Sequence, residues 1–318
     1  MRRQVGSVNT GERPATALFQ QPWWLEAVAP GQWQIAEVRQ NDVLKAWMPY
    51  VMKRGPLGLS ICSMPRLTQT LGPYIAPSSR PYPRALSEDH RLMGQLIDQL
   101  PACDYFSQNL HFSVQNTLPF FWAGYETKVS YTYTINDLAD DDTLLSRMHP
   151  ETRRHLKKAQ KRVQVEDTDD LECFLTLNDM TFARQGIKVP YSHEYVRRLD
   201  DACAQRDQRR IFLARDAQGR PHAAIYVVFD RRAAYYLMVG SHPDFRESCA
   251  VSLCTWEAIK FSRSKSARFD FEGSMMRTVE PFVVGFGAKQ TPYYHVRKYS
   301  RRFKILMAGR DIWHAMRG

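Results

Sequence analysis

Two carboxylates follow each other at the end of an apolar, strand-like segment, FDFEGSM, which runs from Phe269 to Met275. Asp270 and Glu272 are two residues apart, so on an extended chain both side chains point to the same face. Like charges held this close repel each other, and partial burial would raise one pKa and create a general base for an attacking amine. The alternative is a structural role, in which a cation such as Arg268 or nearby backbone amides hold the carboxylates. Both interpretations stay open.

A run of cations forms the strongest charge pattern in the chain. It consists of Arg153, Arg154, Lys157, Lys158, Lys161 and Arg162. On a helix these residues form one broad stripe, and no acidic residue interrupts it. Such a stripe is either a solvated helix face or a surface for a phosphate backbone.

The order of the predicted elements indicates an α+β fold. A boundary near Asp140 separates a disordered N-terminus (1–17) and a first domain (18–138) from a second domain (139–318). In the second domain we expect helices at 143–162, 170–185 and 193–206, three antiparallel strands, a helix at 249–264, the strand ARFDFEG and a last strand, PYYHVRKY. A basic tail follows.

Local motifs in the second half resemble those of GNAT acyltransferases of the Fem type, the peptidoglycan aminoacyltransferases. The motifs are HPETRRHLKKAQK, FARQGIKVPYS, YYLMVGSHPDFRES, WEAIKFS, and FDFEGSM with VEPFVVGFGAKQTPYY. The resemblance covers about 138–298 well, and the first half matches mainly through FQQPWWLEAV. It implies two GNAT-like halves, each with a mixed, mostly antiparallel sheet flanked by helices.

The resemblance also implies roles for particular residues. Asp270, Glu272 and Glu280 are the candidate bases, and Tyr294 is the candidate general acid for the leaving group. The predicted substrate contacts are Arg184, Gln185, Tyr226, Tyr236, Arg277 and Lys289. The basic stripe and Arg246 are the predicted contacts to tRNA or phosphate.

Two departures from the family pattern concern the donor. The loop HPDFRESCAVSL, from His242 to Leu253, lacks the glycines that let backbone amides cradle the pyrophosphate of acetyl-CoA. This favours a donor other than CoA. Fem-type enzymes carry a basic residue just after the position of Phe282, where this chain has Val283 and Val284. Arg277, Lys289 or backbone amides would have to stabilise the transferred ester instead.

The bulk properties agree with an intracellular protein that has an anionic partner. The chain has 318 residues and a net charge of +11, which suits RNA, a phosphorylated cofactor or an anionic membrane surface. Six scattered cysteines predict thiols in a reducing cytoplasm. We expect no signal peptide, membrane span, metal site, nucleotide fingerprint or tightly bound cofactor. The tail is either a membrane-surface helix or, as we favour, docks onto its own domain.

These features together predict a cytoplasmic enzyme that transfers an acyl or aminoacyl group to an amine. The favoured donor is aminoacyl-tRNA, and acyl-CoA is the alternative. The acceptor would be a peptidoglycan precursor or an amine-bearing small molecule, and a peripheral membrane contact is compatible with it. A third hypothesis, from another class, is a non-catalytic RNA-binding protein on a degenerate GNAT fold.

Overall fold

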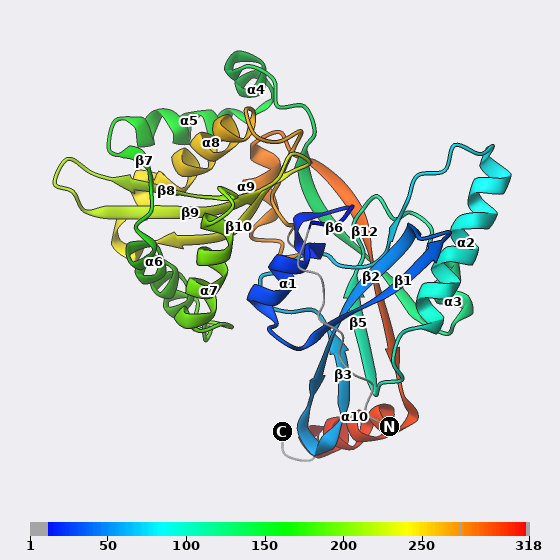
Figure 1. The fold of residues 1–318 in the computed structure, drawn as a ribbon. Coiled ribbons are helices and arrows are strands. Elements are labelled where there is room, and N and C mark those ends of the chain that lie inside the picture. Colours follow the sequence, from blue (N-terminus) through cyan, green and yellow to red (C-terminus); the bar gives the residue numbers. More distant parts are fainter. Residues whose placement is uncertain (1–11, 274, 316–318) are drawn as a thin grey trace. The chain divides into compact units, whose positions relative to one another are not determined.

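A computed structural model describes residues 12–273 and 275–315 (Figure 1). The chain folds into two compact units, one made of residues 1–130 and 292–318 and the other of residues 131–291. The predicted boundary at 138 lies close to the first crossing between them. The second crossing was not predicted: the chain returns to the first unit near residue 292, because its last strand pairs there.

The first unit contains the following elements: η1 (Leu18–Gln20), α1 (Pro22–Val28), β1 (Trp33–Gln40), β2 (Val43–Arg54), η2 (Pro56–Gly58), β3 (Ser60–Ser63), β4 (Tyr74–Ile75), α2 (Tyr82–Asp98), β5 (Tyr105–Asn109), α3 (Leu118–Trp122), most of β12 (Lys289–Tyr299) and α10 (Arg301–Ala315). Strand β6 (Glu126–Ile135) begins in this unit and continues into the second.

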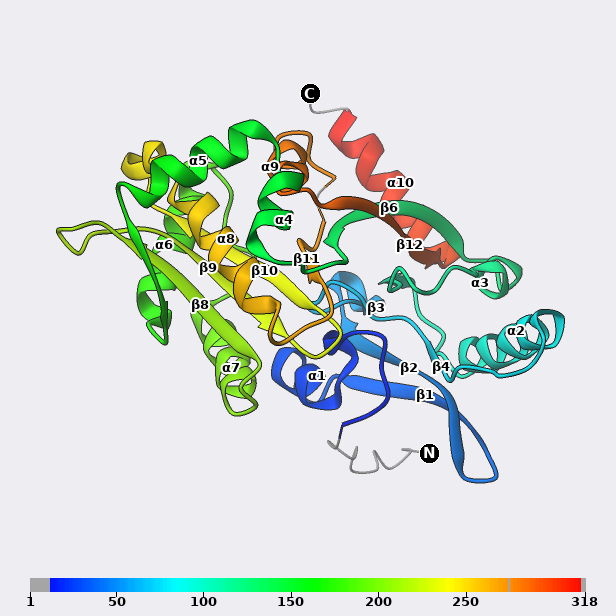
Figure 2. The same cartoon turned by 90° about the horizontal axis from the view of Figure 1, so that it is seen from above.

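The sheet of the first unit has the order β1-β2-β3-β5-β12, and β4 also pairs with β2. Only the β3–β5 pair is parallel. Strands β1 and β2 form a hairpin, and its Asn-Asp turn uses the left-handed conformation, with φ of 48° at Asn41 and 62° at Asp42. Helix α2 packs against β1 and β2 (Figure 2).

The two ends of the described chain are held in place. Residues 12–17 were expected to be disordered, but the Trp47 indole donates to the carbonyl of Pro14, and Arg13 forms an ion pair with Glu37. Residues 1–11 lie outside the described part. In the tail, the Phe303 ring stacks on Tyr105, with centroids 5.1 Å apart, so the start of α10 packs on the first unit. This differs from the favoured docking onto the second domain, to which the tail was assigned. The side chain of Trp313 lies outside the described residues.

The second unit contains these elements: the end of β6, α4 (Asp141–Arg147), α5 (Pro150–Gln160), β7 (Gln164–Thr168), α6 (Leu171–Arg184), α7 (His193–Ala204), β8 (Arg209–Arg215), β9 (Pro221–Phe229), β10 (Ala234–Ser241), η3 (Pro243–Ser248), α8 (Ala250–Ser262), β11 (Phe269–Asp270), α9 (Glu280–Gly285) and the start of β12. The predicted helices and strands are present, except that the strand ARFDFEG is reduced to the two residues of β11.

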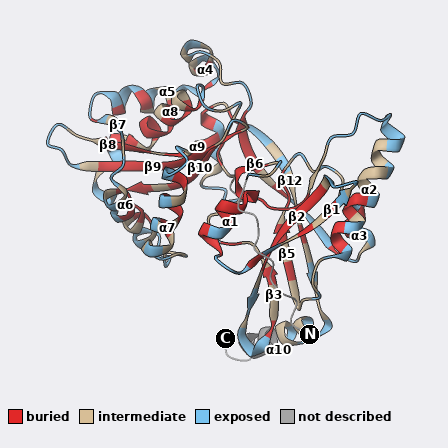
Figure 3. Cartoon of the chain, viewed as in Figure 1, coloured by how far each residue is buried: buried red, intermediate tan, exposed pale blue. Residues whose placement is uncertain are grey.

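The sheet of the second unit has the order β6-β11-β10-β9-β8-β7, and only the β10–β11 pair is parallel. Helices α6 and α7 cover one face, and α5 and α8 cover the other (Figure 1). Buried residues follow the strands and the helix sides turned toward them (Figure 3). The largest fully buried side chains of this unit include Tyr226, Phe174 and Phe269. The predicted α+β class with two mixed, mostly antiparallel sheets is confirmed.

None of the helices in the described part of the chain is long and apolar enough to cross a membrane.

Candidate active site

The segment that carries the two predicted carboxylates leaves the sheet after two residues. β11 pairs with β10 on one side and with β6 on the other, only at Phe269 and Asp270. The backbone then turns at Glu272 and Gly273, whose φ angles are 57° and 68°. A Cβ at Gly273 would lie 2.8 Å from the Cα of Thr132, so only glycine fits this close approach to β6.

Asp270 and Glu272 lie close together where β11 ends. Asp270 is 4% exposed and accepts hydrogen bonds from the Thr132 hydroxyl and from the amide of Glu272. Burial raises the pKa of Asp270 to about 6, although these two donors and Arg268 oppose the rise. Burial and the neighbouring Asp270 charge raise the pKa of Glu272 well above its usual range. Burial thus disfavours the charged form of both carboxylates, and repulsion from Asp270 adds to this effect at Glu272.

The raised pKa of Glu272 disfavours the charged form that would take a proton from an attacking amine. Neither Asp270 nor Glu272 belongs to the lining of the cavities of about 640, 330 and 220 Å³ in the second unit. The pair instead holds the end of β11 against β6, where the Thr132 hydroxyl binds Asp270.

Glu280, the second candidate base, lies at an accessible cavity of about 220 Å³. It opens α9, and its Oε1 accepts a hydrogen bond of 3.0 Å from the hydroxyl of Tyr133. That hydroxyl in turn accepts 3.0 Å from the side-chain amide of Gln290. Burial raises the pKa of Tyr133, so its hydroxyl stays protonated beside Glu280. The cavity is lined by Tyr131, Tyr133, Met275, Met276, Arg277, Glu280 and Gln290. The structure thus brings Glu280 and Arg277 together, as predicted.

Two larger cavities lie where α5, α8 and α9 meet. One has a volume of about 640 Å³ and is lined by the α4–α5 turn, α9 and Ser252. The other has about 330 Å³ and lies at the start of α8. They share His155, Ser252 and Phe282, so they adjoin each other. Glu280 precedes Pro281, which lines the larger cavity, and α9 therefore connects the candidate base to this space.

The smaller cavity contains two of the predicted cations. Arg184, at the end of α6, and Arg246, in η3, are both exposed and line it. No ion pair is found for either guanidinium within the described ranges. Helix α8 begins at this cavity and has no acidic residue in its first turn. Uncompensated cations and a helix N-terminus both favour an anionic ligand.

The loop before α8 contains no glycine, and its conformation leaves few of its amides exposed to a ligand. It folds as η3, and Cys249 then takes a left-handed conformation with φ of 60°. Four amides of the loop donate to groups within it. The Asp244 amide donates to His242 Nδ1, and the Phe245 amide donates to the His242 carbonyl. The Cys249 amide donates to the Arg246 carbonyl, and the Ala250 amide donates to the Ser248 hydroxyl. These amides are not available to cradle a pyrophosphate in this conformation.

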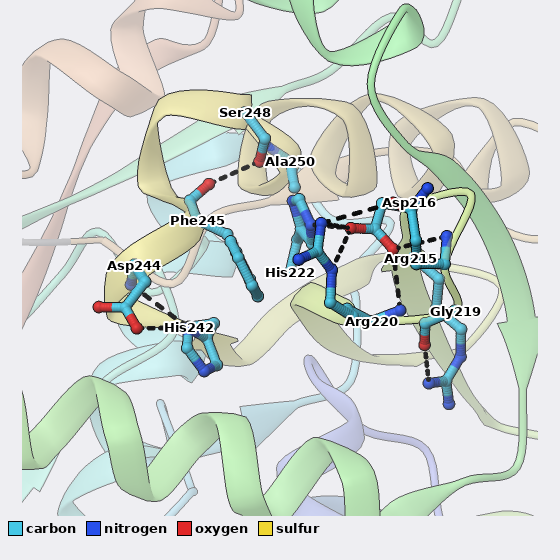
Figure 4. A network of polar contacts seen from close by, with 11 residues as sticks. Arg215, Asp216, Gly219, Arg220, His222, His242, Asp244, Phe245, Ser248 and Ala250 are labelled. Carbon is cyan, nitrogen blue, oxygen red and sulfur yellow. Dashed lines mark hydrogen bonds and ion pairs between the residues drawn. The ribbon is translucent and has the colours of Figure 1, made fainter.

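A polar network supports the same loop from the β8–β9 turn (Figure 4). His222 Nε2 lies 3.1 Å from Asp216 Oδ2, and Arg220 binds the same carboxylate at 2.7 Å. The imidazole of His222 stacks on the Phe245 ring with centroids 4.3 Å apart, and His242 stacks on it at 4.5 Å. Arg220 and His222 hold the pKa of Asp216 well below its usual range.

The basic stripe of α5 is present, with one correction. Arg154, Lys157, Lys158 and Lys161 are exposed, and no carboxylate pairs with them in the described part of the chain. Arg162 is exposed and donates to the carbonyl of Glu247. Arg153 is half-buried and donates to the carbonyls of Leu145 and Met148. Its guanidinium thus closes the turn between α4 and α5, and does not belong to the solvent-facing stripe.

The remaining predicted contacts lie elsewhere. Tyr226 is fully buried and donates to Asp200 at 2.8 Å, so it ties β9 to α7 and presents no surface to a substrate. Tyr236 packs against the core beneath α8. Tyr294 belongs to the first unit, where its carbonyl accepts from the Leu110 amide. Gln185 and Lys289 are exposed and line none of the cavities found in the described ranges.

Sequence reasoning did not single out His155, His222, Phe245 or Tyr133 as parts of a site. A signal existed for His222, because Asp216 and His222 flank the Gly219 turn of a predicted hairpin, which brings such positions together. Tyr133 and Gln290 meet only through long-range packing of the second unit, and no local pattern indicates that contact.

Comparisons with known proteins agree with the predicted family. Residues 146–281 match the model of an acetyltransferase (GNAT) domain. The fold resembles a crystal structure of FemX, with a TM-score of 0.67 and 15% identity over 88% of this chain and 92% of that chain. It also resembles a tandem GNAT protein from the clavulanic acid biosynthesis pathway, with a TM-score of 0.51 and 11% identity over 91% of this chain and 90% of that one.

A third structure is a conserved protein of unknown function from Bacteroides thetaiotaomicron, with a TM-score of 0.51 and 10% identity over 87% of this chain and 90% of that one. No curated protein matches the sequence. At these identities the likeness to solved structures shows the fold. The predicted GNAT fold is confirmed, and it agrees with the Fem-type resemblance.

The buried Asp270 carboxyl predicts an unusual dependence of stability on pH. Its pKa rises from 3.8 in the unfolded chain to about 6 in the fold, so between these values the folded state binds more protons. Its contribution to stability therefore decreases as the pH rises from 4 to 7, by at most about 3 kcal/mol. Asp270→Asn removes this titration and keeps an acceptor for Thr132. Relative to the unmodified protein, we expect the variant to gain free energy of unfolding steadily from pH 4 to 7.

Urea unfolding at several pH values measures this difference. Asp142→Asn, at an exposed position, is the control and should show no such trend. A difference between the Asp270→Asn and unmodified proteins that stays constant from pH 4 to 7 would show that Asp270 titrates normally in the fold.

Proposed function

We propose that this chain, an acyltransferase that carries a GNAT domain, joins an activated carboxyl group to an acceptor amine and uses aminoacyl-tRNA as the donor. The acceptor is a peptidoglycan precursor or a small amine-bearing compound. The observation that carries the proposal is an unpaired basic face on α5, a helix that also lines both larger cavities. The shared fold with FemX supports the same class of reaction.

The basic face suits a nucleic acid better than a small anion. Arg154, Lys157, Lys158 and Lys161 extend over two turns of α5 and its end, so they can contact several phosphates in succession. One turn away on the same helix, Thr152 and His155 line the cavities. A tRNA bound along α5 would therefore have its 3′ end close to the space where transfer takes place.

The loop before α8 supports tRNA over acyl-CoA. The amides of Asp244, Phe245, Cys249 and Ala250 are bonded within the loop, and no glycine permits a closer approach. The exposed guanidinium groups of Arg184 and Arg246 can contact a phosphodiester without those amides. Acyl-CoA stays the alternative donor, and it would require this loop to rearrange. The hydrogen-bonded group of Glu280, Tyr133 and Gln290 beside a cavity favours an enzyme over a non-catalytic RNA-binding protein.

In the proposed mechanism, the acceptor nitrogen attacks the carbonyl carbon of the ester. The new C–N bond forms and the ester C–O bond breaks. Glu280 takes the proton from the attacking amine and returns it to the 3′ oxygen of the tRNA, which leaves as a hydroxyl. Tyr133 holds one carboxylate oxygen of Glu280, which leaves the other free to face the cavity. We assign no role in proton transfer to Glu272, because its raised pKa disfavours the charged form that accepts a proton.

The oxyanion of the tetrahedral intermediate needs a donor other than the basic residue of the Fem-type pattern. Val283 is buried, and Val284 lines the 640 Å³ cavity, so neither supplies charge. Arg277 lines the same 220 Å³ cavity as Glu280, so its guanidinium is a candidate donor to the oxyanion. Beyond Tyr235, β10 has no β11 partner among the described residues, and backbone amides on this edge are a second source of hydrogen bonds.

The proposed donor is tested by transfer from a pool of charged tRNA to amine acceptors. We expect product formation to be abolished by ribonuclease treatment of the donor. In Lys157→Ala/Lys158→Ala, the loss of two phosphate contacts should raise the KM for tRNA about tenfold. A plot of the logarithm of the binding constant against the logarithm of the salt concentration should become less steep, by roughly 1.5 in slope. The control Arg84→Ala/Arg91→Ala removes the same charge from α2 and should bind tRNA normally.

Equal losses in both double variants would mean that only net charge matters. Ribonuclease-resistant transfer from acyl-CoA would refute the tRNA donor and support the alternative. A complete lack of transfer from either donor, with tRNA binding retained, would favour the non-catalytic RNA-binding protein.

The proposed base is tested by Glu280→Gln, which keeps an acceptor for the Tyr133 hydroxyl but cannot take a proton. We expect kcat to fall by about 10²- to 10⁴-fold, with little change in the KM for tRNA. Glu272→Gln is the matched control and should stay active at neutral pH, because the raised pKa of Glu272 disfavours the charged form that could act as a base. Activity measured at saturating tRNA decides between them: an active Glu280→Gln with an inactive Glu272→Gln would reverse the assignment.

A further inference from the structure

The 220 Å³ cavity beside Glu280 carries charged groups of both signs. Arg277 and Glu280 both line it, and Arg277 is exposed. They lie three residues apart in one helical turn, because the carbonyl of Met276 accepts from the amides of Val279 and Glu280. In such a turn, the Cβ atoms of residues three apart are separated by about 5–6 Å. The cavity therefore offers a cation and an anion to one small ligand.

These two charges are not used within the protein. No ion pair joins Arg277 to Glu280, and the Arg277 guanidinium has no hydrogen-bonding or ionic partner among the other described residues. Glu280 is held at one oxygen only, by the Tyr133 hydroxyl. Each charge is thus available to a ligand group of the opposite sign.

The hydrogen bonds around the cavity indicate which ligand groups fit. Gln290 donates to the Tyr133 hydroxyl, which donates to Glu280. The second carboxylate oxygen of Glu280 and Oε1 of Gln290 have no partner in the described part of the chain, and as acceptors they require a donor such as an amine. Arg277 has only donors, and its planar fork matches a carboxylate. An amine and a carboxylate therefore satisfy the two sides of the cavity.

Two methionines add an apolar wall to this cavity. Met275 and Met276 line it, and they are 61% and 55% exposed. Ligand pockets commonly combine apolar walls with a few polar groups that orient the ligand. Methionine is flexible and adapts to apolar groups of different shapes. An apolar side chain on the ligand would cover these two residues.

We propose that the acceptor is an α-amino acid with an apolar side chain. Arg277 binds its carboxylate, Glu280 and Gln290 bind its amine, and its side chain contacts Met275 and Met276. The inference rests on the proposed function, because it takes Glu280 as the base that faces the acceptor amine. A cavity of about 220 Å³ is smaller than the pockets of about 300–1,000 Å³ that hold drug-sized ligands, which agrees with a small acceptor.

The reaction then follows the mechanism given above. The α-amino nitrogen forms the new C–N bond, the ester C–O bond breaks, and Glu280 passes the proton to the leaving oxygen. The carboxylate of the acceptor is unchanged, so the product is an amide with a free carboxylate. Because Arg277 holds the acceptor, the backbone amides at the edge of β10 are left to stabilise the oxyanion.

Four probes separate the groups of the acceptor. L-Leucine carries all of them, L-leucinamide has a neutral amide in place of the carboxylate, O-phosphoethanolamine offers a phosphate, and L-serine lacks the apolar side chain. Transfer to each probe is measured with charged tRNA and, in parallel, with acetyl-CoA as the donor. We expect the KM for leucine to be about 10- to 100-fold lower than that for leucinamide, because leucinamide lacks the charge-assisted bonds to Arg277.

In Arg277→Gln, the KM for leucine should rise by about 10- to 100-fold, and the KM for leucinamide should hardly change. Arg277→Lys keeps the charge without the planar fork, so its KM for leucine should lie between those of the unmodified protein and Arg277→Gln. The matched control is Arg231→Gln, which removes an exposed cation between β9 and β10 and should leave both KM values unchanged. Thermal unfolding shows that the variants are folded.

The apolar wall has its own test. L-Serine should have a KM about tenfold higher than L-leucine, because it buries less apolar surface. In Met275→Ser/Met276→Ser this difference should disappear. Equal KM values for serine and leucine in the unmodified protein would refute the contact with the two methionines.

An equal fall in kcat for leucine and leucinamide in Arg277→Gln, with both KM values unchanged, would place the guanidinium at the oxyanion and overturn the acceptor assignment. Equally efficient transfer to leucinamide, or better transfer to phosphoethanolamine, would refute the carboxylate and leave the proposed function intact. If none of the four probes receives a group, the α-amino acid acceptor is refuted. The proposed function fails with it only if all other amine acceptors are inert as well.

Discussion

The close approach of α9 to the start of α5 is the constraint on which the site depends. The carbonyl of Gly285 accepts from the amide of His149 at 2.9 Å, and a Cβ at position 285 would collide with the Thr152 hydroxyl. Only glycine permits this contact. It fixes α9, and α9 in turn presents Glu280 at one cavity and Pro281 and Phe282 at another. The base and the space for the donor are therefore set by one helix–helix contact.

Charge is distributed unevenly over the second unit. Cations that pair with carboxylates serve the fold, and cations without an acidic partner in the described residues are the candidates for binding a ligand. Around β7 and β8, the arginines are committed to carboxylates: Arg209 pairs with Asp200, and Arg210 pairs with Asp167 and Asp207. On α5 and beside α8, no acidic residues compensate Arg154, Lys157, Lys158 and Arg246 in the part of the chain that the structure describes. Leaving cations unpaired side by side costs stability, and a polyanionic partner offsets that cost when it binds.

The sequence predicted the elements of the second unit well, because each has a strong local pattern. The α5 stripe follows from spacing alone, and the turn after β11 follows from Gly273. The division of roles among the carboxylates could not be predicted. It depends on burial: burial raises the pKa of Asp270 and of Glu272, whereas Glu280 meets Tyr133 and Gln290 at an open cavity. These contacts join segments more than 130 residues apart, and no local pattern encodes them.

The path of the chain was also beyond local patterns. PYYHVRKY was correctly expected to be a strand, but its partner β5 lies nearly 190 residues earlier. Tyr294 therefore belongs to the first unit, while the carboxylates belong to the second. Likewise, Arg153 has the spacing of the basic stripe, yet its guanidinium binds two carbonyls of the preceding turn. Spacing predicts which residues share a face, but it does not show which of them the fold has already used.

The central claim is that a charged tRNA binds along α5 and delivers its 3′ end to the start of α8. Hydrogen–deuterium exchange of the full chain, with and without aminoacyl-tRNA, tests this claim most directly. The account predicts slower amide exchange in residues 150–161 and 243–252, with little change in α2 of the first unit. Unchanged exchange in these two segments under saturating tRNA, or protection confined to the first unit, would contradict it.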